Sequence, residues 1–381
     1  MPNSIVNPRF SATLRRLRAE RGLSVRDLSR LVHHGKTLVH DLETGRARPG
    51  YDIARRLDDA LRAGGELAAM AVAGSGLPDP DEAARVAHVV RHPRRVDLST
   101  VASLATVLAH QRRLEDTIGS AAMLGPVVGQ LCVIEHLVTE TSGHLRSDLV
   151  DVASQWAQFA GWLAVATGRP AGAAARFDRA LALAAEIGGR EMTATALSFK
   201  GYLAERMGQP GAMVGLTEAA MRDRGVFIGQ RAYDALQLAR GHAMRDDRAG
   251  VGSALAEAAD LTAGFAEYGG PVPDWHYYRS PAFFDIEQGR VYALLGEHEP
   301  DGNRRAVDLL AAGLDALPAE QRGAEWAAEY RLHLAHALAR AGNPTAARAA
   351  AEAVRVVASA SGAAALVRRA EELSARLSGD T

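Results

Sequence analysis

A short segment near the middle of the chain occurs twice, and this repetition constrains the fold more than any other feature of the sequence. Residues 161–170 read GWLAVATGRP, and residues 201–210, 40 positions further on, read GYLAERMGQP. Related endings occur at residues 292–296 and 337–344, with a weaker copy at 242–247. Each unit reads as a helix, a turn and a second, alanine-rich helix. One helical hairpin cannot bury its apolar face alone, so the units are expected to stack into a solenoid.

Within the first unit, Gly161, Ala173, Phe177 and Ala180 follow a small-small-aromatic-small spacing. This spacing resembles that of a tetratricopeptide repeat. The offsets between copies run from about 39 to 49 residues, longer than the roughly 34 of the regular family, so the units are irregular. The resemblance implies an array of tetratricopeptide-like hairpins over residues 98–381. The alternative is an alanine-rich bundle without true repeats.

The whole chain of 381 residues reads as helical. Apolar residues recur every three or four positions, and no stretch shows the sustained alternation of a strand. The clearest break is residues 74–80, GSGLPDP, which are rich in helix-breaking and small residues. A chain of this length exceeds one ordinary core. We therefore predict an all-α protein of two domains, residues 1–73 and 98–381, joined by a flexible or partly extended linker over residues 74–97.

Four short helices are predicted before the linker. The first carries Leu14 and Leu17 on its apolar stripe and ends at Gly22, which suits a left-handed C-terminal cap. Ser24 begins the second helix, and Asp27 follows three residues later, as in a capping box with a shorter acid. Three apolar residues of this second helix are expected to face the core: Leu28, Leu31 and Val32.

The second and third helices are joined by a tight turn over residues 33–35, which read His-His-Gly. The third helix is predicted over residues 36–43, with Val39 and Leu42 facing inward. A fourth helix is predicted to start near Tyr51. Two short helices joined by a turn of about three residues have the geometry of a helix-turn-helix.

Three stretches of this region carry a family resemblance: residues 17–24 (LRAERGLS), 27–29 (DLS) and 42–49 (LETGRARP). They resemble the lambda-repressor-like family of helix-turn-helix proteins, also called the xenobiotic-response-element type, over about residues 10–65. The Leu-Glu-x-Gly-x-x-x-Pro ending is the most specific part. The turn departs from the family pattern, which usually begins with glycine where this chain has His33. The resemblance implies sequence-specific DNA binding that controls transcription.

The resemblance also implies that the third helix enters the major groove with its N-terminal residues against base edges. The residues expected at base edges are Lys36, Thr37, His40 and Asp41. A lysine can donate to guanine, and an aspartate can accept from cytosine. The residues expected near phosphates, which position the protein without reading sequence, are Ser24, Thr44, Arg46 and Arg48. The alternative is a module of the same fold that binds protein rather than DNA.

One such domain covers one half-site, so we expect a homodimer on double-stranded DNA that contains an inverted repeat. The charge distribution agrees with a DNA-binding head. Residues 1–95 hold 17 Lys and Arg against 11 Asp and Glu, whereas the remainder holds 27 against 34. A basic head on an acidic body is typical of a protein whose head alone contacts phosphate, although chance scatter produces imbalances of this size.

Several classes of protein are not expected from this sequence. We find no run of about 18 apolar residues and no signal-peptide pattern at the N-terminus, so we expect a cytoplasmic protein with no membrane span. Cys132 is the only cysteine, which excludes an intrachain disulfide and a Cys-rich zinc site. No motif of a hydrolase, metalloprotease, phosphate-binding loop or dinucleotide fold is present. We therefore expect neither enzymatic activity nor a cofactor or bound metal.

The most distinctive part of the repeat domain is residues 265–284, which hold seven of the chain's 20 aromatic residues. Aromatic rings on a repeat surface can form a stacking pocket, with a basic residue as its polar handle. The residues we assign to a ligand site are Trp275, His276, Tyr277, Tyr278, Arg279, Phe283 and Phe284. The alternative is that these rings pack a long, irregular connection onto the array.

Together these features predict a DNA-binding transcriptional regulator whose repeat domain dimerises and senses a small molecule, a peptide or a partner protein. The combination of this reader with alanine- and arginine-rich repeats resembles regulators of high-GC actinobacteria. A competing hypothesis is a scaffold whose helical repeats bind a protein, with the helix-turn-helix as a minor DNA tether. The sequence does not decide between repressor and activator.

Overall fold

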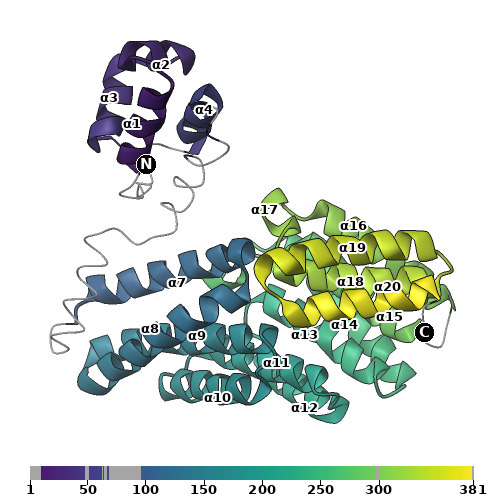
Figure 1. The fold of residues 1–381 in the computed structure, drawn as a ribbon. Helices are drawn as coiled ribbons and strands as arrows, with labels where there is room; N and C mark the ends of the chain where they lie inside the picture. The colour runs from purple at the N-terminus through teal and green to yellow at the C-terminus, as the bar shows by residue number, and fades with distance from the viewer. Residues whose placement is uncertain are drawn as a thin grey trace. The chain divides into compact units, whose positions relative to one another are not determined.

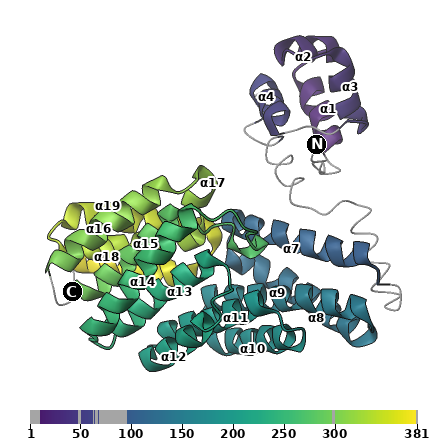
Figure 2. The same cartoon turned by 180° about the vertical axis from the view of Figure 1, so that it is seen from behind.

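The computed structural model describes residues 10–47, 51–61, 63, 67, 96–296 and 300–379. Every regular element in these ranges is a helix, so the predicted all-α class is confirmed (Figure 1 and Figure 2). The chain divides into two compact units, Met1–His88 with Ala102–His110, and Val89–Val101 with Gln111–Thr381. Of the predicted linker over residues 74–97, only residues 96 and 97 are among those described.

Four helices of the first unit are described: α1 (Phe10–Glu20), α2 (Val25–Leu31), α3 (Lys36–Thr44) and α4 (Tyr51–Leu61). Their apolar faces meet in one core, whose fully buried members include Phe10, Leu14, Leu28 and Leu57. The prediction that Leu31 is buried is wrong, because its side chain is 54% exposed. Helix α2 is only seven residues long. Leu28 and Val32 fill its inner side, and Leu31 is left on the solvent side.

The turn between α2 and α3 has a left-handed backbone at His33, where φ is 54°. The family resemblance places a glycine at this position, and the backbone explains the preference. Glycine adopts a positive φ without the steric cost that a Cβ atom imposes. The predicted left-handed cap at Gly22 is confirmed, with φ of 65°.

The remaining helices form the repeat region. In chain order they are α7 (Leu98–Ile118), α8 (Ser120–Glu140), α9 (His144–Ala166), α10 (Pro170–Glu186), α11 (Arg190–Arg206), α12 (Pro210–Met221), α13 (Ile228–Ala243), α14 (Arg248–Ala266), the short 3-10 helix η2 (Asp274–His276), α15 (Pro281–Leu295), α16 (Pro300–Ala316), α17 (Ala319–Arg322), α18 (Glu325–Arg340), α19 (Pro344–Ser361) and α20 (Ala364–Ser378). Helices adjacent in sequence pack as hairpins, most extensively α9 with α10, α13 with α14, α15 with α16 and α18 with α19.

The repeated Gly-x-Pro ending has a direct structural meaning. The glycine that ends the first helix of a hairpin is left-handed at three copies, with φ of 71° at Gly168, 68° at Gly208 and 80° at Gly342. Two residues later a proline occupies the start of the next helix, where its missing N–H costs nothing. In the weaker copy at residues 242–247, Asp246 takes the left-handed position with φ of 55°.

The array curls until its first and last hairpins meet (Figure 1). At the corner between α7 and α8, the backbone N–H of Ser120 donates to the carboxylate of Glu325 at 3.1 Å. A Cβ on Gly119 would lie 2.6 Å from the Cβ of Ser361, in α19. The ends of the array are therefore in van der Waals contact, and the second unit is a closed stack rather than an open solenoid.

Among the described residues, α8 alone is long and apolar enough to span a membrane by length and composition, with a mean hydropathy of 1.6. This helix packs along α9 and buries Met123, Val127, Leu131 and Ile134. Of its most hydrophobic window, 39% is buried inside the structure.

Close packing between α9 and α10 leads to a testable prediction. A Cβ on Gly161 would lie 2.3 Å from Cε1 of Phe177, whose ring is fully buried. Gly161→Ala should therefore lower the free energy of unfolding of the repeat region by about 1–3 kcal/mol, measured by circular dichroism in urea. Gly129→Ala is the matched control, because nothing lies within 4 Å of the position that its new methyl group would occupy. This control should stabilise α8 by up to about 1 kcal/mol; equal effects of the two changes would contradict the packing.

Candidate functional site

Helix α3 presents one polar face to solvent and one apolar face to the core. Val39 and Leu42 are each 1% exposed and anchor the helix, as predicted. Of the residues expected at base edges, Lys36, Thr37 and His40 are exposed and Asp41 is half-buried. The structure therefore leaves the polar face of α3 exposed to solvent.

The orientation of α3 is fixed by hydrogen bonds from α1. The guanidinium of Arg18 binds the Glu43 carboxylate through two bonds of 2.5 and 3.0 Å, and these bonds raise the pKa of Arg18. Nη2 of Arg15 donates to the backbone oxygen of Glu43 at 2.6 Å, and the Ser11 hydroxyl donates to that of Leu42 at 2.7 Å. Glu43, the glutamate of the Leu-Glu-x-Gly motif, therefore positions the reading helix.

The residues expected near phosphate differ in how free their polar groups are. The Ser24 hydroxyl accepts the Asp27 N–H at 3.1 Å, and the Asp27 carboxylate accepts the Ser24 N–H at 3.2 Å, which is the predicted capping box. The Thr44 hydroxyl donates to the backbone oxygen of His40 at 2.9 Å. Arg46 is exposed, and Arg48 lies outside the described residues. Of the residues expected near phosphate that the structure describes, Arg46 is thus the one best suited to an unhindered phosphate contact.

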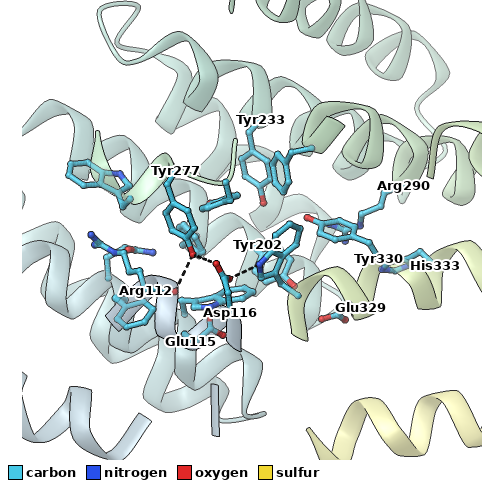
Figure 3. A pocket seen from close by; sticks show the side chains of 18 residues that line it. Arg112, Glu115, Asp116, Tyr202, Tyr233, Tyr277, Arg290, Glu329, Tyr330 and His333 are labelled. Atoms are coloured by element: carbon cyan, nitrogen blue, oxygen red, sulfur yellow. Dashed lines mark hydrogen bonds between the residues drawn. The ribbon is translucent and has the colours of Figure 1, made fainter. Parts of the chain in front are cut away.

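The second unit contains a cavity of about 100 Å³ inside the closed array (Figure 3). Its walls come from α7, α9, α11, α13, the η2 segment, α15 and α18. Eleven of its eighteen lining residues are aromatic: Phe159, Trp162, Phe199, Tyr202, Tyr233, Trp275, Tyr277, Tyr278, Phe283, Trp326 and Tyr330. Trp162 and Tyr202 occupy the same place in the two repeated segments, so the repeat itself supplies part of the wall.

Four of the residues that the sequence assigned to a ligand site line this cavity: Trp275, Tyr277, Tyr278 and Phe283. The other three pack outside it. His276 is buried and stacks on Phe227 with ring centroids 5.4 Å apart. Arg279 donates to the backbone oxygen of Gly229 at 2.8 Å, and Phe284 packs edge-on against Phe265. These three residues therefore fit the alternative prediction, in which the side chains pack the irregular connection onto the array.

The sequence did not identify α7 and α18 as walls of the cavity. Asp116 accepts a hydrogen bond of 2.7 Å from the Tyr277 hydroxyl and one of 2.8 Å from Nε1 of Trp326 (Figure 3). Burial raises the pKa of the Asp116 carboxyl, and both hydrogen bonds oppose that rise. Aromatic residues at an interval of four, Trp326 and Tyr330, are the only local signal on α18 that pointed to this wall.

A buried network of two arginines and two glutamates lies next to the aromatic residues of the cavity, which Arg290 also lines. Arg290 donates to Glu205 at 2.6 Å, and Arg240 contacts Glu205 at 3.3 Å and also pairs with Glu287. The Tyr330 hydroxyl donates to Glu287. The four formal charges cancel, so this network forms a neutral and well-connected floor.

Arg112, on α7, stands apart from that network. Its side chain is buried, and its one hydrogen bond is a 3.3 Å contact to the backbone oxygen of Gln155. The rings of Phe159 and Trp275 each lie 5.8 Å from the guanidinium carbon. Burial lowers the pKa of Arg112 to about 10, which leaves the group positively charged at neutral pH.

Among the described residues, no cluster of three or more His, Cys, Asp or Glu is arranged to hold a metal ion. His333 lines the cavity, and burial lowers its pKa well below the ordinary value. His336 is only partly buried, and its pKa is lowered to about 4. Both imidazoles are therefore neutral at physiological pH.

Comparison with known proteins bears on the first unit only. Residues 9–70 match the family model of the helix-turn-helix domain. No curated protein matches the chain. The matched range contains α1 to α4 and the exposed face of α3, so the first unit is a helix-turn-helix domain and the chain is a DNA-binding regulator.

The buried carboxyl of Glu115 predicts a pH dependence of defined sign. Burial raises its pKa from 4.5 to about 8, opposed by a hydrogen bond from Ser120. The folded chain therefore binds this proton more tightly than the unfolded chain does. The resulting stability is complete at acid pH and is lost as the pH rises from about 4.5 through about 8.

We expect the melting temperature of the repeat region to fall between about pH 6 and about pH 8.5, corresponding to about 2 kcal/mol from this group. Glu115→Gln, which imitates the protonated carboxyl, should flatten that fall. Glu140→Gln, at an exposed end of α8, serves as the control. Identical pH profiles for the parent and both variants would show that Glu115 does not titrate in this way.

Proposed function

We propose that the chain is a transcriptional regulator that reads an inverted-repeat operator as a homodimer and senses a small molecule in the cavity of its repeat region. The observation that carries the sensing role is the cavity itself. Ligand sites are concave, mainly apolar and equipped with a few polar groups, and this cavity combines eleven aromatic rings with Arg112 and Asp116.

The coupling that we propose runs through α7. Arg112, Glu115 and Asp116 lie on this helix and line the cavity, and α7 is the first described helix that follows the helix-turn-helix domain in sequence. A ligand that binds these groups better in one position of α7 than in another shifts the population toward that position. Such a shift would change the spacing of the two DNA-binding domains and hence the affinity for the operator.

The dimer is supported by the size of the reader. One helix-turn-helix domain covers one half-site, and two half-sites lie about 34–36 Å apart on one face of the duplex.

We propose further that the hairpins are of the tetratricopeptide type, that the protein acts in the cytoplasm, and that it has no catalytic activity. The buried positions of Gly161, Ala173, Phe177 and Ala180 support the first of these points.

Selection of binding sites from random DNA by the full-length protein tests the reader. We expect an inverted repeat to be enriched. Lys36→Ala should weaken binding to the selected site by about 1–3 kcal/mol and relax the preference at one base position. Arg46→Ala should weaken binding to all sequences alike and reduce its salt dependence. Lys200→Ala, the only other lysine of the chain, is the matched control because Lys200 pairs with Asp178 in the repeat region.

Two results would contradict this assignment. A Lys36→Ala variant with unchanged affinity and unchanged site preference would show that the register of α3 is wrong. A selection without any enriched site would favour the competing scaffold, in which the repeats bind a protein and the reader is a minor tether.

The sensing role is tested with a library of single-ring fragments, screened by thermal shift and then added to the protein on its operator. A bound fragment should change operator affinity by about 5–150-fold, the range of typical allosteric coupling. Trp275→Ala should abolish this response and leave ligand-free DNA binding intact, because the Trp275 ring lines the cavity from the η2 segment rather than from a hairpin.

Tyr268→Ala is the control, since Tyr268 lies in the same aromatic segment, is 37% exposed and does not line the cavity. A Trp275→Ala variant that still responds to the fragments would place the sensing site elsewhere. A fragment that binds without any change in operator affinity would contradict the coupling.

A further inference from the structure

Arg112 differs from Arg290, the other arginine that lines the cavity, in its lack of an ion-pair partner among the described residues. Arg290 pairs with Glu205, and Glu329 pairs with Arg206 and Arg369. No carboxylate in the described part of the chain forms an ion pair with Arg112, whose side chain is 4% exposed. The Asp274 carboxylate acts on the guanidinium through its charge without forming an ion pair with it, so Arg112 is buried with no direct ionic contact in the described part of the chain.

The hydrogen-bonding capacity of this guanidinium is also largely unused. An arginine side chain carries five N–H donors. The protein engages one of its nitrogens, Nη2, in the 3.3 Å contact to Gln155, which is at the long end of the range for a hydrogen bond. Arg112 lines the cavity, so its remaining donors are available to a molecule inside it (Figure 3). A planar guanidinium matches a carboxylate, which can accept two of these donors at once.

The other acidic groups near the cavity do not oppose an anion strongly. Asp116 keeps its negative charge when it is ionised, but its two oxygens accept hydrogen bonds from Tyr277 and Trp326, which stabilise that charge locally. Glu115, with its pKa of about 8, is mostly protonated at neutral pH. The arginine and glutamate floor is neutral. Arg112 is thus the charge that selects the ligand.

The shape of the site determines what carries the anion. Phe159 and Trp275 each lie 5.8 Å from the guanidinium carbon and both line the cavity, so a group attached to a carboxylate on Arg112 meets aromatic walls. Flat rings gain most from such walls through stacked and edge-on contacts. The cavity volume of about 100 Å³ is several times the roughly 10–15 Å³ that one water needs by the same measure, and it limits the ligand to one ring or a small fused pair.

We propose that the cavity binds a small planar aromatic carboxylic acid, whose carboxylate pairs with Arg112 and whose ring packs against aromatic walls that include Phe159 and Trp275. This inference rests on the proposed sensing function and names the chemical class of its ligand. Binding satisfies a buried cation to which the described residues supply no ion-pair partner.

Isothermal titration calorimetry of the full-length protein tests this inference with two matched pairs of probes, benzoate with benzamide and 1-naphthoate with 1-naphthamide. Each acid should bind about 10–100-fold more tightly than its neutral amide, as expected for hydrogen bonds to a charged group. Arg112→Gln should remove this preference by weakening binding of the acid while leaving that of the amide within about threefold. Arg113→Gln is the control, because Arg113 is the next residue of α7, is exposed and does not line the cavity.

Arg112→Lys keeps the charge but not the planar fork, and it serves as the second variant if Arg112→Gln does not fold. It should retain a reduced preference for the acid. Equal binding of acid and amide to the parent, an unchanged affinity of the acid for Arg112→Gln, or no binding of any of the four probes would overturn the inference.

Failure of the inference is distinguishable from failure of the proposed function. If an acid binds through Arg112 but operator affinity does not change, the ligand class stands and the sensing role is wrong. If a neutral aromatic compound alone changes operator affinity, sensing stands and the assignment of an acid is wrong.

Discussion

The carboxylate of Asp116 joins parts of the helical array that are far apart in sequence. It accepts hydrogen bonds from Tyr277 and Trp326, which follow it by 161 and 210 residues. Hairpins that contact only their neighbours form an extended stack with an open concave face. Because Asp116 joins α7 to the η2 segment and to α18, the stack instead encloses a space. The cavity is a consequence of this long-range contact rather than of any one repeat.

Two charged groups that line the cavity, Arg290 and Glu329, form ion pairs within the described part of the chain, whereas Arg112 and Asp116 form none there. The pairs of Arg240 and Arg290 with Glu205 and Glu287 hold three hairpins together. Buried ion pairs of this kind contribute little net stability, but removal of one partner is strongly destabilising, so they fix the geometry of the floor. Arg112 is outside this network. A ligand that enters or leaves can therefore change the pairing of Arg112 without disturbing the paired groups that shape the site.

Local features of the fold were predictable because residues close in sequence set them. The Gly168-x-Pro170 turn and the Ser24–Asp27 capping box are of this kind, and both were read from the sequence. The cavity was predictable only in part. Concentrated aromatic residues identified the Trp275 wall, but nothing near Arg112 in sequence indicates that its helix returns to that wall. The sequence also did not separate rings that line the cavity from those that pack the connection, since both environments select aromatic residues.

Arg112 lies on α7, the first described helix that follows the DNA-binding domain in sequence. A ligand can shift an equilibrium only by binding two conformations with different affinity. In the proposed mechanism, pairing of the ligand with Arg112 supplies that difference. Four residues along the same helix, Asp116 binds Tyr277 and Trp326. Helix α7 thus carries both the contact with Tyr277 and Trp326 and the charge that a ligand would neutralise. Because both lie on one helix, no relay through packed side chains is required between that contact and that charge.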